Sequence, residues 1–346
     1  MNKTETQNPV CRTIEPFTPG PLTRNPHIQT YVKSIKFLVR HNNPIIEHAR
    51  SMIIQGTDGV RLHGYYTPHS DRNAQGLLLL LHGWEGSSNS AYILHTGRYF
   101  YHKGYDVFRL NLRDHGGSHH LNEGLFHAGL LDEVLAAAEH IAALRPDAPL
   151  YVIGFSLGGN FALRLALRHT DVALDNLAHV FAVSPVIDPL KATVTLDSGS
   201  RFYRHYFLRK WIRSLKKKEQ AFPARYNFGP TYGMKTVMDI TDYIIERYSP
   251  FQNHREYFST YTLPAASFED LSVPVTIITA EDDPVVPVED FRALRENDKL
   301  CMLIQSYGGH CGFIDPFPFG SWYERIINCM IQNGNPYVDK KDTART

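Results

Sequence analysis

The sequence lacks several features that would narrow its function at once. Its 36 basic and 35 acidic side chains leave a formal net charge of +1, so the basic excess that binding to a phosphate backbone needs is missing. Its longest wholly apolar runs, such as Leu77 to Leu81, fall far short of the roughly 20 residues that span a bilayer. We therefore expect no nucleic-acid partner and no transmembrane segment.

Export and disulfide signals are also missing. The N-terminal stretch MNKTETQNPVCRTIEPF has no basic region followed by an apolar one, so it does not resemble a secretory signal. The four cysteines form no CxxC pair and no disulfide framework; they are Cys11, Cys301, Cys311 and Cys329. This pattern is typical of free thiols in a reducing compartment. The sequence thus predicts a cytoplasmic protein with free cysteines.

What the chain has in abundance is an alternation of strand-like and helix-like segments. The turn signal Thr57-Asp58-Gly59 predicts an antiparallel hairpin of 51–55 and 61–67. Further apolar runs predict buried strands at 76–81, 105–110, 150–153, 179–183, 273–279 and 299–305. Helical spacing lies between them at 92–102, 132–144, 160–168, 288–295 and 322–331. The pattern predicts an α/β fold, a mostly parallel sheet of about eight strands flanked by helices.

Two intervals depart from this rhythm. Residues 188–264 contain no convincing strand but are dense in Arg, Lys, Tyr and Phe, which indicates a helical lid inserted after the sixth strand. Residues 1–45 are rich in proline, which favours an extended arm lying over the domain. The remaining residues, 46–187 and 265–346, then form the two parts of one α/β core.

The strongest chemical signal is the pentapeptide Gly154-Phe155-Ser156-Leu157-Gly158. It lies between the strand-like LYVI and the helix-like NFALRLALRH, where a G-x-S-x-G motif holds its serine on a strained turn. The alternative is that the pentapeptide is only a glycine-rich turn, without a catalytic serine. A serine hydroxyl is a weak nucleophile, so catalysis would need a base oriented by an acid.

Both partners are available downstream, in the order Ser, Asp, His. The run VPVTIIT leads into Ala280-Glu281-Asp282-Asp283-Pro284, and KLCMLIQ leads into a loop that ends Gly-Gly-His310. Asp283 is the better candidate for the acid because it is the fourth residue of a loop whose usual form is G-x-x-D. Asp282 is the alternative, although an aspartate there can instead cap the turn. The flexible Gly-Gly approach favours His310 as the base.

An acyl-transfer serine also needs hydrogen-bond donors for the oxyanion. The backbone N–H of Leu157, directly after the nucleophile, is the expected first donor, and the N–H of Trp84 is the expected second. Trp84 lies in His82-Gly83-Trp84-Glu85-Gly86, after the third strand. Its side chain can instead line an acyl pocket, and His82 is expected to be structural.

With HGWEGSS, GFSLGGN, AEDDPVVP and GGHCGF, together with RNPHIQT near the N-terminus, the chain resembles an α/β-hydrolase. More narrowly, it resembles the YheT-like esterase/lipase branch, which includes the mammalian α/β-hydrolase domain lipases. The resemblance runs from Arg24 to about Asn335. It implies a triad of Ser156, Asp283 and His310 that hydrolyses carboxylic esters or lipids without a cofactor. Alternatives are acyl transfer by the same triad and a non-catalytic membrane-docking or partner-binding module.

Three weaker features remain. A cluster of histidines, His115, His119, His120 and His127, suggests a metal site, but intervening glycines disfavour a helix and the glutamate of HExxH is missing. We therefore expect no metal. Cys311, beside the expected base, is either a redox-sensitive thiol or, more simply, a buried inert one.

The segment Arg201 to Lys218 is the one strong charge run. As a helix it would align Tyr203, Phe207, Trp211 and Leu215 on one face and gather Arg209, Lys210, Arg213 and Lys217 towards another. One interpretation is a lid helix with its aromatic face over the active site and a solvated basic face. The other is an interfacial helix attracted to anionic lipid, which would give peripheral membrane contact.

Overall fold

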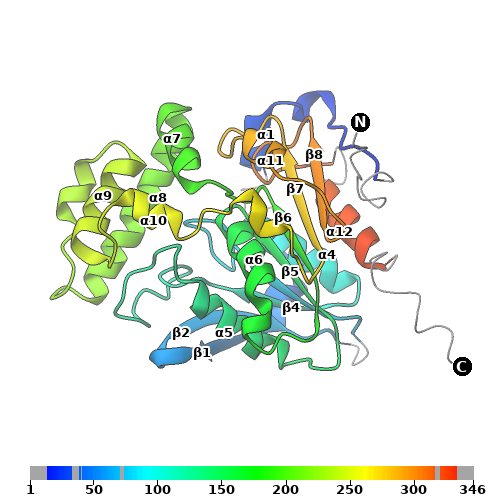
Figure 1. The fold of residues 1–346 in the computed structure, drawn as a ribbon. Coiled ribbons are helices and arrows are strands. Elements are labelled where there is room, and N and C mark those ends of the chain that lie inside the picture. Colours follow the sequence, from blue (N-terminus) through cyan, green and yellow to red (C-terminus); the bar gives the residue numbers. More distant parts are fainter. Residues whose placement is uncertain (1–13, 33–38, 40, 71–73, 316–319, 333–346) are drawn as a thin grey trace, which may run out of the picture.

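A single twisted sheet runs through the middle of the molecule (Figure 1). The computed structural model describes residues 14–32, 39, 41–70, 74–315 and 320–332. The strands are β1 (Arg50–Gln55), β2 (Arg61–Thr67), β3 (Leu77–Leu81), β4 (Asp106–Leu110), β5 (Leu150–Phe155), β6 (Leu177–Val183), β7 (Val275–Ala280) and β8 (Leu300–Gln305). They form one eight-stranded sheet in the order β1-β2-β4-β3-β5-β6-β7-β8. β2 is antiparallel to β1 and β4, and the other neighbours are parallel, so the predicted fold class is confirmed.

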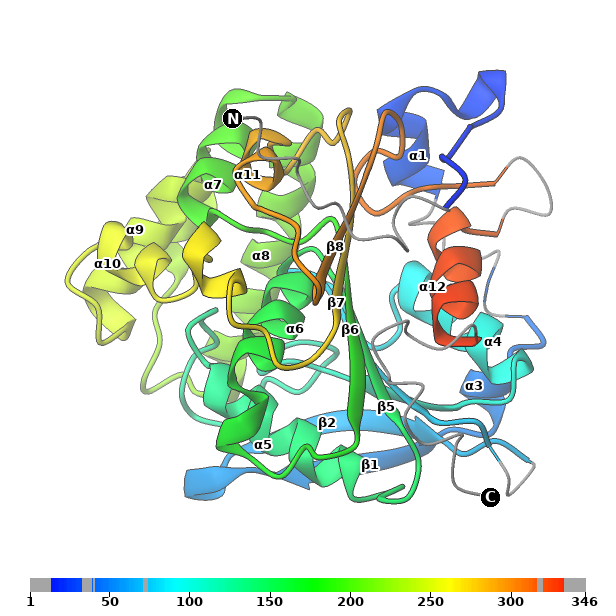
Figure 2. The same cartoon turned by 45° about the vertical axis from the view of Figure 1, so that its right-hand side comes forward.

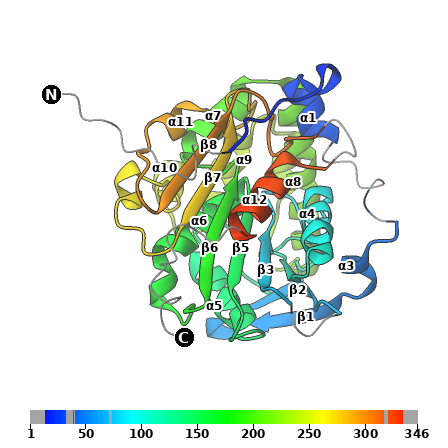
Figure 3. The same ribbon diagram turned by 90° about the vertical axis from the view of Figure 1, so that its right-hand side faces the viewer.

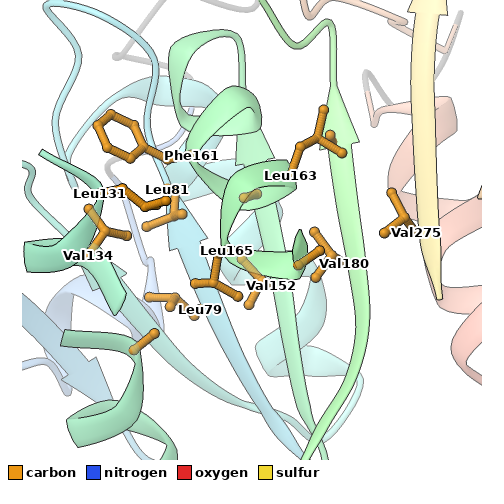
Figure 4. Close-up of a cluster of buried hydrophobic side chains, with 14 of the residues drawn as sticks. Leu79, Leu81, Leu131, Val134, Val152, Phe161, Leu163, Leu165, Val180 and Val275 are labelled. Carbon is orange, nitrogen blue, oxygen red and sulfur yellow. The ribbon is translucent and has the colours of Figure 1, made fainter. Parts of the chain in front are cut away.

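Helices cover both faces of the sheet, as parallel strands require. Figures 2 and 3 show α4 (Ala91–His102) and α12 (Trp322–Gln332) together on one face, and α5 (Leu131–Ala142) and α6 (Leu157–Arg168) on the other. The five leucines of β3 are fully buried because alternate side chains enter opposite layers. Leu78 and Leu80 join the cluster under α4 and α12. Leu79 and Leu81 join the cluster under α5 and α6, part of which is drawn in Figure 4.

The interval between β6 and β7 is helical. It contains the insertion helices α7 (Pro189–Ser198), α8 (Arg201–Ala221), α9 (Val237–Tyr248) and α10 (His254–Ser259), grouped at the left of Figure 1. Side-chain caps start three of them: Asp188 accepts from Lys191 N, Thr236 from Asp239 N and Asn253 from Glu256 N. These helices share a small hydrophobic core of their own, which includes Leu208, Phe228 and Ile240.

One buried ion pair ties α8 to the rest of the fold. The Lys218 side chain is fully buried, and its Nζ donates to Asp114 Oδ1 at 2.8 Å, Asn122 O at 2.7 Å and Gly124 O at 2.9 Å. Burial lowers the pKa of Lys218 and raises the pKa of Asp114, and the attraction between the two charges opposes both shifts. The sequence places Lys218 at the end of a solvated charge run, but the carboxylate and the backbone carbonyl groups that accept from it compensate for its burial.

The described part of the predicted extended arm is partly helical, so that prediction needs correction. Pro26–Val32 forms α1 and Pro44–Glu47 forms α3, because proline suits the first turn of a helix. Asn25 and Asn43 accept hydrogen bonds from the first-turn N–H groups. The segment does lie against the core, since Gln29 Oε1 accepts from Ile314 N at 2.7 Å and Phe17 N donates to Gln305 Oε1 at 2.7 Å.

The prediction of free cysteines is wrong for Cys301. Cys301, on β8, is disulfide-bonded, whereas Cys311 and Cys329 are thiols; Cys11 lies outside the described residues. Disulfide pairing depends on proximity in the fold, which the wide spacing of the four cysteines does not reveal. Within the described ranges, none of the helices is both long and apolar enough to cross a membrane.

Candidate active site

Ser156 lies on the sharp turn between β5 and α6. Its backbone has φ 54° and ψ −117°, a left-handed conformation that costs a non-glycine residue about 1 kcal/mol or more. The flanking glycines let the turn close. A Cβ on Gly154 would fall 2.2 Å from Gly158 O, and a Cβ on Gly158 would fall 2.4 Å from Leu81 O. The turn therefore presents the hydroxyl at the N-terminus of α6.

The structure brings Ser156, His310 and Asp283 into one hydrogen-bonded chain. His310 Nε2 lies 2.9 Å from Ser156 Oγ, and His310 Nδ1 lies 2.9 Å from Asp283 Oδ2. The three residues follow the carboxyl ends of the parallel strands β5, β8 and β7, where ligands commonly bind in α/β sheets. The side chain of Asp283 is fully buried, and that of His310 is 9% exposed.

The two neighbouring aspartates are used differently. Asp283 Oδ1 also accepts the N–H groups of Val285 and Val286, at 2.8 and 3.0 Å, which hold the carboxylate towards the imidazole. Asp282 Oδ1 instead accepts the N–H of Gly309 at 2.8 Å. Asp282 therefore supports the loop that carries His310, while Asp283 contacts the ring itself.

The surroundings of His310 favour its protonated form. Burial is the largest single influence and would lower the pKa of the imidazole, but the charge and hydrogen bond of Asp283, together with those of Cys311, outweigh it and raise the pKa well above its usual value. The backbone of His310 is held by a residue that the sequence did not single out. Thr30 on α1 accepts the His310 N–H at 2.9 Å. In the sequence, only the loose similarity of the stretch RNPHIQT to α/β-hydrolases drew attention to this part of the arm.

The two expected oxyanion donors lie beside the serine. Leu157 opens α6, and Trp84 sits in the loop after β3, where Gly83 N donates to Tyr92 OH at 2.9 Å and Glu85 N donates to His115 Nε2 at 3.2 Å. Within the part of the chain that the structure describes, neither the Trp84 N–H nor the Leu157 N–H has a hydrogen-bond acceptor. Both donors therefore remain available to a ligand.

His82 supports this loop from below. It is fully buried, with Nδ1 donating to Gly83 O at 2.8 Å and Nε2 accepting from Leu112 N at 3.2 Å. Burial lowers the pKa of its imidazole well below the usual value, so the ring stays neutral. These contacts give His82 the structural position expected for it.

Two cavities meet at Ser156. The first, about 150 Å³, extends under the insertion helices and is lined mainly by apolar side chains, among them Leu196, Phe207, Trp211, Leu215, Ile244 and Phe251. The second, about 430 Å³, lies between α1 and the start of α8 and includes Tyr31, Tyr206 and Lys210. The Trp84 side chain lines both cavities and stacks on Phe207, with ring centroids 5.5 Å apart.

Two of the four histidines considered as metal ligands have other partners. His115 Nδ1 lies 2.7 Å from Arg113 O, and His119 Nε2 lies 2.9 Å from Ser214 Oγ. Burial lowers the pKa of His115 to about 4 and that of His119 to about 3. Among the described residues, no three His, Cys, Asp or Glu side chains gather as a potential metal site.

The sheet order and the site together define an α/β hydrolase, and the comparisons agree. A family profile described as "alpha/beta hydrolase fold" matches residues 76–317. The chain therefore belongs to the α/β hydrolase fold family and is a hydrolase. An esterase of Pyrococcus furiosus, Pf2001, has a similar fold: its TM-score is 0.54 at 16% identity, over 82% of this chain and 92% of that one.

Sequence relatives extend over most of the chain. An abhydrolase domain-containing protein of Dictyostelium discoideum is 23% identical over 94% of this chain and 83% of its own length. The human phospholipase ABHD3 is 21% identical over 78% of this chain and 68% of its own length. The putative esterase YheT of Escherichia coli is 25% identical over 68% of this chain and 70% of its own length. The predicted resemblance to YheT-like proteins is thus confirmed.

Proposed function

We propose that the protein is a serine hydrolase that cleaves carboxylic esters. The observation that carries this proposal is the chain of contacts from Ser156 Oγ through His310 to Asp283. His310 Nε2 removes the proton as Ser156 Oγ attacks the ester carbonyl, and Asp283 orients the imidazole and stabilises its positive charge. The N–H groups of Trp84 and Leu157 bind the oxyanion.

The second half of the cycle uses the same groups. His310 returns its proton to the leaving alcohol, which departs and leaves an acyl group on Ser156. Water then loses a proton to His310 and attacks the acyl carbonyl. As the bond to Ser156 Oγ breaks and the acid leaves, His310 returns that proton to Ser156 Oγ. No step requires a cofactor. An alcohol in place of water would give acyl transfer, and adding an alcohol to the assay measures how the acyl group is divided between the two acceptors.

The first cavity favours an apolar acyl chain over a peptide or sugar. Its lining is mainly aliphatic and aromatic and begins at Ser156, so a hydrocarbon chain entering it would leave water without losing hydrogen bonds. The names of two relatives, an esterase and a phospholipase, agree with an ester or lipid substrate.

A series of p-nitrophenyl esters of increasing chain length tests this assignment. We expect a fluorophosphonate probe to label Ser156, and kcat/KM to rise to an optimum chain length and then fall. Ala192, on α7, lines the first cavity, so Ala192→Phe should shift the optimum towards shorter chains. Val194→Phe is the matched control, because Val194 lies on the same helix and is 52% exposed. An unlabelled Ser156, in folded protein, would contradict the proposal.

We also propose that α8 contacts anionic lipid surfaces. Its residues Tyr203, Phe207, Trp211 and Leu215 face inward, but Phe202 and Tyr206 are 61% and 40% exposed where they line the second cavity. Exposed cations lie on the same helix, at Arg201, Arg209 and Arg213. An apolar rim beside positive charge suits the interface of an anionic membrane.

Vesicle co-sedimentation checks this contact. Binding to vesicles that contain phosphatidylserine should exceed binding to neutral vesicles, and Phe202→Ser should weaken it several-fold because an apolar anchor is lost. Ile53→Ser serves as the control, since Ile53 is 47% exposed but lies on β1. Equal binding of the wild type to both kinds of vesicle would argue against a membrane role.

A further inference from the structure

The loop that carries Trp84 also holds a carboxyl group that the proposed reaction does not use. Glu85 has φ 54°, in the left-handed region that glycine adopts more easily. Glu85 lines both cavities, as Ser156 does, and its side chain forms a hydrogen bond with Ser214 on α8. The fold thus tolerates an unfavourable backbone conformation and places an acid beside the reacting centre, which is typical of a functional residue.

A cation faces the same space. Lys210 on α8 lines the second cavity, where Glu85 is the one acidic side chain among the described lining residues. The Lys210 ammonium lies 4.9 Å from the centre of the Tyr206 ring. It forms no ion pair with any residue in the described ranges, so its charge is available to a ligand.

Charged or titratable groups near Glu85 come from three elements, and His310 lines the second cavity with it. α8 contributes Lys210 and Lys217, the loop after β4 contributes Asp114 and His115, and the end of β3 contributes His82. Asp114 is paired with Lys218, and both histidines are neutral because burial lowers their pKa values.

The Glu85 carboxyl itself is mostly protonated at neutral pH. Burial raises its pKa to about 8, even though the Lys210 charge acts in the opposite direction. Below that pH the group is neutral and can donate a hydrogen bond. No negative charge among the described lining residues of the second cavity then opposes the Lys210 ammonium, and Glu85 opposes it on ionising.

We propose that Lys210 and Glu85 bind an anionic group on the alcohol portion of the ester. This inference rests on the proposed esterase function and deepens it. Because the apolar first cavity takes the acyl chain, the second cavity receives the alcohol portion on the other side of Ser156. Lys210 attracts the anion, and protonated Glu85 donates a hydrogen bond to it. Ionised Glu85 repels the anion, so the preference for anionic esters should be lost as the pH rises through about 8.

Three esters of one fatty acid test the proposal. Their alcohols are glycerol, which is neutral, 2-hydroxyethanesulfonate, which is always anionic, and choline, which is always cationic. The readout is the ratio of kcat/KM values between esters at pH 6.5 and 9.0, in which the common titration of His310 cancels. At pH 6.5 the wild type should prefer the sulfonate ester to the glycerol ester by about tenfold, and at pH 9.0 this preference should disappear.

Substitutions test the contributions of Lys210 and Glu85 separately. Lys210→Met should abolish the preference at pH 6.5 and, like the wild type, show none at pH 9.0. Glu85→Gln should keep the preference for the sulfonate ester at pH 9.0, because the amide stays neutral there. Glu85→Gly should also keep this preference, and glycine suits the left-handed backbone at this position. Lys216→Met is the control, since Lys216 is exposed on the same helix and lies over Tyr232.

The outcomes distinguish this inference from the function on which it rests. Equal cleavage of the three esters by wild-type protein, or a preference for the choline ester, would overturn the anion site while the esterase function stands. A sulfonate preference that Glu85→Gln loses at pH 9.0 would overturn the role of Glu85. Failure to cleave any ester, with Ser156 unlabelled by fluorophosphonate, would instead reject the esterase function.

Discussion

Replacing Ser156 by alanine is expected to lower kcat for ester hydrolysis by about 10⁴- to 10⁶-fold. The substitution removes the only atom that contacts His310 Nε2 in the triad, so no acyl-enzyme can form. The oxyanion donors and the cavities remain, so substrate should still bind and a small residual rate should persist. Steady-state kinetics and loss of fluorophosphonate labelling measure the effect.

A second serine controls for general damage to the fold. Ser306 is exposed and lies in the loop that leads to His310, so Ser306→Ala should change kcat/KM by less than about twofold. Circular dichroism should give the same spectrum for both variants. If Ser156→Ala keeps more than a tenth of the wild-type activity, Ser156 is not the nucleophile.

Replacing Asp283 by asparagine should produce the next largest loss, about 10⁴-fold in kcat. The amide keeps the size of the side chain but removes the charge that stabilises the imidazolium, and it favours the wrong tautomer of His310. Asp282→Asn is a close control, because its amide oxygen can still accept the Gly309 N–H. We expect Asp282→Asn to lose less than about tenfold. Larger losses in Asp282→Asn than in Asp283→Asn would reverse the assignment.

We also expect Asp283→Asn to change the pH dependence of kcat/KM. Asp283 and Cys311 together outweigh burial and raise the pKa of His310 well above its usual value, and the base must be neutral to accept a proton. Wild-type kcat/KM should therefore fall as the pH drops through this raised pKa. Without the carboxylate, burial dominates and the pKa of His310 falls, so the acidic limb of the Asp283→Asn profile should move to lower pH.

Much of the α/β core could be predicted from local patterns. Parallel strands buried on both faces appear as continuous apolar runs, as in Leu77–Leu81, and each predicted strand overlaps an observed one. The sharp turn at Ser156 could also be predicted, since only small residues fit at positions 154 and 158. Such features depend on residues that are close together in the chain, so they can be predicted from the sequence alone.

Features that depend on distant contacts were missed or misjudged. Lys218 looked like one more solvated cation, but it meets a carboxylate 104 residues away. Thr30 lies 280 residues from the His310 N–H that it accepts. The arm appeared extended because prolines are frequent there, although proline also begins helices, and Cys301 showed no sign of a disulfide partner. No local sequence pattern predicts a contact between residues so far apart in the chain.

The sequence by itself therefore determined the fold class and singled out Ser156 and His310, and it favoured Asp283 over Asp282. The order of the motifs along the chain and the residue types of the turns can be recognised without a tertiary structure. Only the tertiary structure decided that Asp283, not Asp282, touches the imidazole, because both lie in one loop and only side-chain direction separates them. It also decided that Glu85 and Lys210 face one cavity. The basic and acidic residues of the chain nearly cancel in number, but the fold gathers two ionisable side chains in the cavity that Ser156 lines.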